Sequence, residues 1–157
     1  MELAKRIHQI NLEKGFYDPP ASRARRWMLI ASELFEAIEG LRENNFNPSL
    51  DSDPQIIKTS VACEMADAYI RVLDFMAYEG FQSLWTLDYF HHADPAEQIF
   101  YISAVIHAHR NDSNKASSSV KQLIETFCIK NNINLMAFVE WKLEYNSKRE
   151  YKHGKEW

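Results

Sequence analysis

The sequence has few of the residues that interrupt regular structure or cross-link a chain. Its 157 residues include only four glycines, five prolines and two cysteines. Because glycine and proline are the strongest helix breakers, their scarcity favours long helices. The two cysteines, Cys63 and Cys128, lie in apolar stretches without a spacing that suggests a partner, so we interpret them as reduced core residues of a cytoplasmic protein.

Three further observations narrow the class of protein. No apolar run reaches the length that spans a membrane, and the N-terminal segment lacks the apolar core of a signal peptide, so we expect no membrane partner. A formal net charge of -4 argues against a nucleic-acid-coating protein but leaves a small anionic substrate open. The length predicts one domain, residues 1–157, with a core of its own.

Apolar periodicity and capping residues predict an all-α bundle of about five to six helices. The predicted helices cover residues 3–14, a segment that opens at 18–22 and runs to 44, and residues 54–79, 95–109, 115–130 and 135–148. No segment has a convincing strand pattern, and the aromatic-rich residues 81–92 are ambiguous. The connections are short, as is typical of helical bundles.

The segment from residue 55 to 79 is apolar on three sides and acidic on one. At 100° per residue its polar positions form one narrow seam: Ser60, Glu64, Asp67, Arg71 and Asp74. A helix that is apolar almost all round is a buried helix, and burying carboxylates is costly unless positive charge meets them. Because Arg71 alone cannot neutralise three acids, the simplest missing charge is a hard cation, which suggests phosphate chemistry.

The preceding predicted helix carries glutamates three residues apart, at Glu33, Glu36 and Glu39. If the two helices pack antiparallel, the pair Glu33-x-x-Glu36 can face Glu64-x-x-Asp67, because residues three apart share a helix face. Four carboxylates on two rigid helices would form a cage for Mg²⁺. The alternatives are a solvated acidic face on the first helix and a buried ion pair with Arg71 on the second. Whether Glu39 or Asp74 joins the metal ligands is left open.

A second constellation lies near the end of the last predicted helix. Lys142, Asn146 and Arg149 share one face and lead into a basic tail that includes Lys152 and His153. Arginine offers a planar fork for phosphate, and lysine offers a mobile point charge. The alternative is a basic helix end favoured by the helix dipole.

At these motifs the chain resembles a known family, the MazG-like all-α nucleoside triphosphate pyrophosphohydrolases. The two acid pairs and their separation look like the family signature, and residues 142–155 (KLEYNSKREYKHGK) and 13–16 (EKGF) are similar to the two ends of its members. Two features depart from the pattern. Ser32 stands where the family often has an additional Glu, and residues 81–133 form an insertion relative to a minimal family core.

The resemblance implies a site and a reaction. The residues implied to hold Mg²⁺, with Mn²⁺ as a possible substitute, are Glu33, Glu36, Glu64 and Asp67. Those implied to bind substrate are Lys142, Asn146, Arg149, Lys152 and His153. The implied reaction cleaves a ribo- or deoxyribonucleoside triphosphate between its α and β phosphates, giving a monophosphate and pyrophosphate. A water activated at the metal would attack, with Glu33 or Glu36 as general base. Family members are usually dimers or larger, so we expect a homodimer or higher homo-oligomer.

Two alternatives compete with an enzyme. The first is a non-catalytic helical protein that binds a nucleotide or a partner through a degenerate site. The second is a structural interaction module whose acids pair with Arg71 and with lysines. The histidines do not suggest a third, because His91, His92, His107 and His109 lack partners at metal-ligand spacing.

Overall fold

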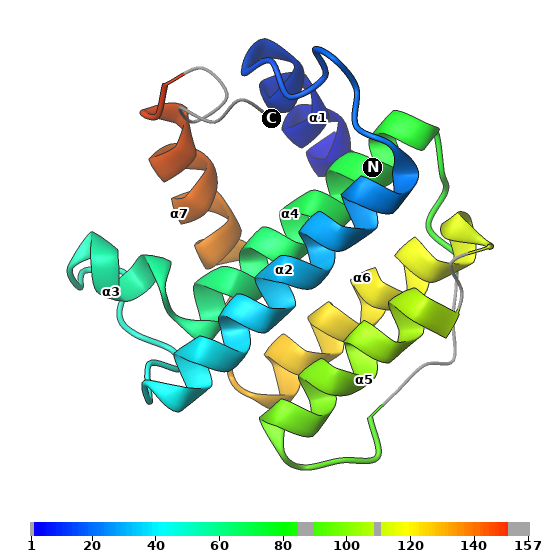
Figure 1. Ribbon diagram of the computed structural model, residues 1–157. Helices are drawn as coiled ribbons and strands as arrows, with labels where there is room; N and C mark the ends of the chain where they lie inside the picture. The colour runs from blue at the N-terminus through cyan, green and yellow to red at the C-terminus, as the bar shows by residue number, and fades with distance from the viewer. Residues whose placement is uncertain (1, 85–89, 109–110, 151–157) are drawn as a thin grey trace.

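A computed structural model describes residues 2–84, 90–108 and 111–150, and within these ranges the chain forms seven α-helices and no strand (Figure 1). They are α1 (Glu2–Glu13), α2 (Arg23–Arg42), α3 (Pro54–Lys58), α4 (Val61–Glu79), α5 (Pro95–Ala108), α6 (Ser113–Lys130) and α7 (Leu135–Ser147). The prediction of an all-α fold is confirmed. In the part of the chain that is described, no helix combines the length and apolarity needed to cross a membrane.

The prediction of a single helix over residues 54–79 is wrong, and this raises the helix count to seven. The backbone of Ser60 is extended, and its Oγ accepts a hydrogen bond of 3.2 Å from the backbone N–H of Cys63. The N–H groups of Val61 and Ala62, which precede Cys63, donate at 3.0 Å to carbonyl oxygens of the loop at 45–46. The first N–H groups of a helix have no acceptors within the helix, and here a side chain and a loop provide the acceptors. Ser60 is therefore a helix cap and not part of the polar seam.

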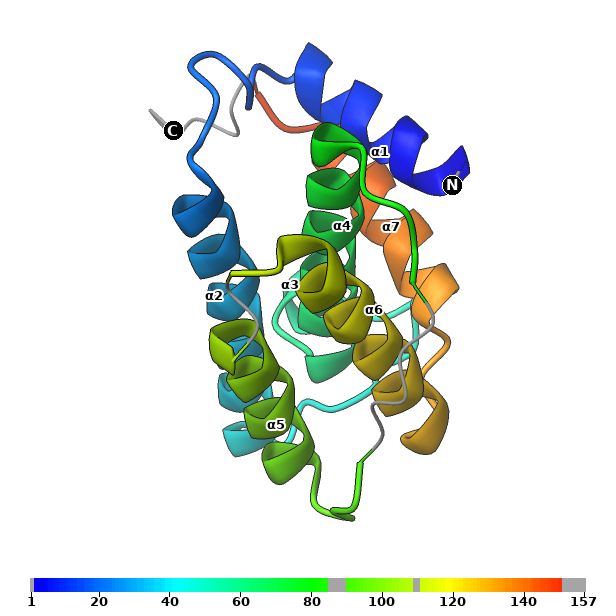
Figure 2. The same ribbon diagram turned by 90° about the vertical axis from the view of Figure 1, so that its right-hand side faces the viewer.

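Helix α4 is the centre of the fold. It packs against α1, α2, α6 and α7, with α1 and α7 on one side of the α2–α4 pair and the α5–α6 hairpin on the other (Figures 1 and 2). Between Val61 and Met76 every residue of α4 is buried except Asp67, Arg71 and Asp74. These three residues belong to the predicted polar seam. The only solvent-accessible side chains along the middle of α4 are therefore charged.

Helices α2 and α4 run antiparallel and touch at both ends. At one end Arg23 pairs with Glu79 through two hydrogen bonds of 2.6 and 3.0 Å. At the other end Gly40 lies against the first turn of α4. This arrangement brings the middle of α2, which carries Glu33, onto the first half of α4.

Gly40 allows the close approach of the two helices, and replacing it tests that packing. A Cβ at this position would lie 2.9 Å from the backbone nitrogen of Val61 and 3.0 Å from the carbonyl oxygen of Thr59. Because backbone atoms cannot rotate away, Gly40→Ala is expected to lower the free energy of unfolding by about 1 to 3 kcal/mol, although alanine is the better helix former. Urea unfolding would measure the change, with Phe35→Ala on the exposed side of α2 as the control. Unchanged stability would show that the helices can separate without cost.

The α5–α6 hairpin belongs to the same hydrophobic core as the rest of the chain. It provides fully buried residues such as Ile102, Leu123 and Phe127, and it packs against α2 and α4. The segment between α4 and α5 that the sequence left ambiguous lies partly outside the described residues. Within the predicted insertion at 81–133, the described residues therefore add two helices, α5 and α6, to the bundle.

Candidate metal centre

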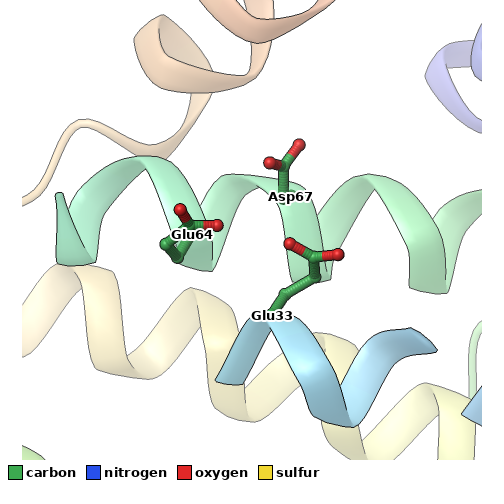
Figure 3. A group of neighbouring side chains, drawn as sticks. All are labelled: Glu33, Glu64 and Asp67. Carbon is green, nitrogen blue, oxygen red and sulfur yellow. The ribbon is translucent and has the colours of Figure 1, made fainter. Parts of the chain in front are cut away.

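Three carboxylates meet where α2 crosses α4. One carboxylate oxygen from each of Glu33, Glu64 and Asp67 lies within 4.8 Å of the others (Figure 3). Glu33 and Glu64 are each only 5% exposed, and the Asp67 side chain is 14% exposed. The three-residue spacing predicted that Glu64 and Asp67 share a face, and the antiparallel packing of α2 brings Glu33 to that face.

Glu36, the fourth predicted ligand, lies at the edge of this cluster. It is exposed, and no described residue donates a hydrogen bond to its carboxylate. Its negative charge nevertheless contributes to raising the pKa of Glu64, so it lies within electrostatic reach. The structure thus brings three of the four predicted ligands together and leaves Glu36 facing solvent beside them.

The two acids whose membership the sequence left open have partners elsewhere. Glu39 accepts hydrogen bonds of 2.8 and 2.9 Å from Arg42 on the surface of α2. Asp74 lies 2.8 Å from Nδ1 of His8 on α1. Neither belongs to the acidic cluster.

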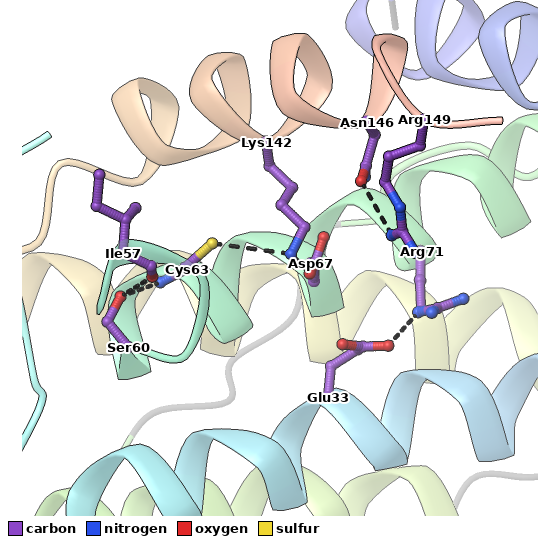
Figure 4. Close-up of polar contacts among 9 residues, drawn as sticks. All are labelled: Glu33, Ile57, Ser60, Cys63, Asp67, Arg71, Lys142, Asn146 and Arg149. Atoms are coloured by element: carbon purple, nitrogen blue, oxygen red, sulfur yellow. Dashed lines mark hydrogen bonds and ion pairs between the residues drawn. The ribbon is translucent and has the colours of Figure 1, made fainter. Parts of the chain in front are cut away.

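Two of the clustered acids are paired with cations of this chain (Figure 4). Nε of Arg71 donates to Oε1 of Glu33 at 2.6 Å. Lys142, on α7, forms an ion pair with Asp67 and lies 3.9 Å from Sγ of Cys63. The sequence predicted Arg71 as a counter-ion of the seam and left pairing of the acids with unspecified lysines as an alternative. It did not single out Lys142 for this role, because α7 is remote from α4 in sequence.

The ammonium group of Lys142 is buried but stays charged. Burial is the largest single effect and would lower its pKa, but the neighbouring acidic groups, Asp67 foremost, together outweigh burial and hold the pKa above its usual value. Burial also raises the pKa of Asp67, while Lys142 opposes that effect. A buried charge pair of this kind depends on both partners, because either one alone would be an uncompensated buried charge.

Glu64 is the member of the cluster that has no ion-pair partner among the described residues. No described residue donates a hydrogen bond to its carboxyl group, although the residue is 5% exposed. Burial, followed by the charge of Asp67, raises its pKa to about 9, with Lys142 opposing and with Glu33 and Glu36 adding to the effect. Without a further cation, Glu64 is protonated at neutral pH.

The chemistry of the donors fits a hard divalent cation. All three clustered ligand groups are carboxylates, the type preferred by Mg²⁺ and Mn²⁺. The nearby thiol of Cys63 does not change this preference, because burial raises its pKa to about 12 and keeps it protonated. The buried carboxyl of Glu64, which has no partner in the part of the chain that the structure describes, is the observation that points to a bound ion.

The predicted phosphate-binding face consists of Lys142 and Asn146 on α7 and Arg149 just after it. Of these, Lys142 is buried and paired with Asp67. Figure 4 shows Asn146 of α7, and Arg149 just after the end of α7, pointing toward α4, and Nη1 of Arg149 donates to Oδ1 of Asn146 at 3.4 Å. Nζ of Lys14 donates to the carbonyl oxygens of Ser147 and Arg149, at 2.9 and 2.7 Å. Through these two contacts Lys14 holds the C-terminal end of α7 next to the C-terminal end of α1. Lys152 and His153 lie outside the described residues.

The role of Lys14 was missed by the sequence analysis, which noted its segment only for the family resemblance. A lysine that binds backbone carbonyls has no partner side chain whose spacing could reveal it. Among the described residues, the acidic cluster is the only group that brings three possible metal ligands together. His92 and His107, for example, contact Glu97 and the carbonyl oxygen of Ser103.

Comparison with known proteins gives no assignment, because no family model, curated protein or solved structure matches the chain.

Proposed function

We propose that this protein is a magnesium-dependent nucleotide pyrophosphohydrolase that cleaves nucleoside triphosphates between the α and β phosphates. The observation that carries the proposal is the buried carboxyl group of Glu64, which has no partner among the described residues and lies beside two other acids. The resemblance of the acid pairs and of the basic tail to MazG-like enzymes supports the same reaction. As in that family, the working form is proposed to be a homodimer or higher homo-oligomer.

The charges at the site support a divalent ion. Glu33, Glu36, Glu64 and Asp67 would carry four negative charges when ionised, and Arg71 and Lys142 supply two positive charges. The difference is the charge of one Mg²⁺. When bound, the ion would neutralise charge on the phosphate chain and favour the ionised form of water at the site.

Glu36 is the better placed general base. One oxygen of Glu33 already accepts a hydrogen bond of 2.6 Å from Arg71, whereas the carboxylate of Glu36 is exposed and accepts none from a described residue. In the proposed step a water oxygen bonds to the α-phosphorus, a Glu36 oxygen takes the water proton, and the bond from the α-phosphorus to the bridging oxygen breaks. Pyrophosphate leaves with the bridging oxygen, and Glu36 returns its proton to solvent.

Arg149 and Asn146 are proposed to hold the leaving phosphates. Arg149 carries a permanent positive charge and is already oriented by Asn146, so less side-chain freedom is lost when it binds an anion. The contacts of Lys14 with the end of α7 would keep this pair in place.

A direct assay tests the reaction. We expect the purified protein with Mg²⁺ to release pyrophosphate, and not orthophosphate, from at least one member of a panel of ribo- and deoxyribonucleoside triphosphates. Release should stop when EDTA is added and return with excess Mg²⁺ or Mn²⁺. Absence of pyrophosphate release from every triphosphate would contradict the proposal.

A second candidate is a non-catalytic protein, and the two ion pairs favour it. Glu33 is paired with Arg71 and Asp67 with Lys142, which is the pairing expected of a structural module. In that case Mg²⁺ would not bind, and it would leave the melting temperature unchanged. The proposed enzyme should instead melt at a higher temperature in Mg²⁺ than in EDTA.

A further inference from the structure

We infer that Arg71 binds the phosphate chain of the substrate directly, using the two nitrogens that its ion pair with Glu33 leaves available. This inference rests on the proposed function and adds a residue that neither the acid signature nor the basic tail includes. The ligand class is a nucleoside triphosphate or a similar polyphosphate anion, whose phosphate oxygens would accept hydrogen bonds from Arg71.

The guanidinium group of Arg71 is only partly used. Its Nε donates to Glu33, and no described residue accepts a hydrogen bond from Nη1 or Nη2. Guanidinium carries five N–H groups in a planar fork, so the outer two nitrogens can bind a phosphate while Nε holds a carboxylate.

Of the two cations that pair with the clustered acids, Arg71 is the accessible one. Its side chain is 38% exposed, whereas that of Lys142 is 8% exposed and engaged with Asp67. Arg71 lies on the charged seam of α4, one turn after Asp67, where the rest of the middle of the helix is buried. An anion that approaches the acidic cluster along this seam therefore meets Arg71.

The pair with Glu33 gives Arg71 its orientation. The Glu33 side chain is 6% exposed and is held between α2 and α4, so the guanidinium cannot move far while it keeps the 2.6 Å contact. Figure 4 shows Arg149 pointing from the segment just after α7 toward the part of α4 that carries Arg71. Arg71 would then contact the phosphate chain from α4, and Arg149 from the segment just after α7.

The test compares Arg71→Gln and Arg71→Lys with the wild type and with a control. Arg23→Gln is the matched control, because Arg23 also forms an ion pair between α2 and α4, with Glu79, but lies ten residues before Glu33, about 15 Å along the helix. Two quantities would be measured: the KM for the best triphosphate, and the Kd of inorganic tripolyphosphate in Mg²⁺ by calorimetry. The second measurement needs no turnover.

We expect Arg71→Gln to raise both the KM and the Kd by about 10- to 100-fold, the effect of losing a charge-assisted hydrogen bond to phosphate. Arg71→Lys should recover only part of this, since lysine lacks the fork. Mg²⁺ binding without phosphate should be unchanged or tighter, because the substitution removes a positive charge next to Glu33. Arg23→Gln should leave the KM and both binding constants unchanged.

The outcomes separate this inference from the proposed function. If Arg71 only neutralises Glu33, both variants will melt at lower temperature but bind tripolyphosphate as the wild type does, and the inference is overturned. If the wild type binds tripolyphosphate through Arg71 but releases no pyrophosphate from any triphosphate, the inference stands and the proposed reaction fails. If the wild type does not bind tripolyphosphate at all, the inference is wrong.

Discussion

Replacing Glu64 by Gln is expected to lower metal-dependent pyrophosphate release by about 1000-fold or more, while making the metal-free protein more stable at pH 8. Glutamine keeps the size of the side chain but cannot carry the negative charge that a divalent ion requires. The same change removes a buried carboxyl group that has no partner among the described residues. Loss of activity through unfolding would give the opposite change in stability, so the two measurements together separate a role at the site from a role in folding.

The direction of the stability change follows from the pKa of Glu64. Its value is about 9 in the folded protein against 4.5 for an exposed glutamate, so between these pH values the native state holds a proton that the unfolded chain has lost. The free energy of unfolding therefore falls as the pH rises from about 4.5 to about 9. The groups that face Glu64 are Asp67, Glu33, Glu36 and Lys142, from three helices.

Urea unfolding in EDTA at pH 6 and pH 8 would measure this effect. The wild type should lose about 2 to 3 kcal/mol over this interval from Glu64 alone, and Glu64→Gln should lose that much less. Glu144→Gln is the control, since Glu144 pairs with Lys148 on the surface and its side chain is 72% exposed. Equal pH dependence in wild type and Glu64→Gln, or retained metal-dependent turnover in the variant, would contradict the role given to Glu64.

The sequence predicted the helices because their signals are local. Asp53 and Asn134 cap α3 and α7, and Gly80, with a φ of 69°, ends α4 in the left-handed conformation that glycine tolerates best. The break at Ser60 was missed because serine also fits the polar seam of a continuous helix. What ends the helix there is a contact with the loop at 45–46, which the sequence of residues 54–79 does not reveal.

The acidic cluster was predicted from spacing, but its charge balance was not. Spacing places Glu64 and Asp67 on one face, and a short connection places Glu33 opposite them. The count of charges along α4 found Arg71 but not Lys142, which follows Asp67 by 75 residues and reaches it only because α7 packs on α4. Lys142 therefore supplies part of the positive charge that the sequence left unaccounted for, by pairing with Asp67. It does not pair with the carboxyl group of Glu64.

Replacing Lys142 by Met is expected to lower the free energy of unfolding of the metal-free protein by about 3 to 5 kcal/mol, and Mg²⁺ is expected to recover part of this loss. Methionine fills a similar volume, but it leaves Asp67 without its ion-pair partner in a site where Lys142 is only 6% exposed. The loss should be larger at pH 8 than at pH 6, because at lower pH protonation of the clustered carboxyl groups removes the uncompensated charge.

The recovery by Mg²⁺ is the informative part of this prediction. A divalent ion and the ammonium group of Lys142 both neutralise the same acids, so removing the lysine should tighten Mg²⁺ binding and enlarge the stabilisation that the ion gives by mass action. Unfolding in EDTA and in Mg²⁺ measures this difference, with Lys148→Met as the control, since Lys148 pairs with Glu144 on the surface and its loss should change stability by no more than about 0.5 kcal/mol. The result in the two buffers decides what the acids bind. If Lys142→Met is destabilised equally in EDTA and in Mg²⁺, the acids bind the lysine but no ion, and the cluster is a structural ion pair. If the loss of stability is smaller in Mg²⁺ but not in Na⁺ of equal ionic strength, the carboxylates form a divalent cation site that Lys142 neutralises while the ion is absent.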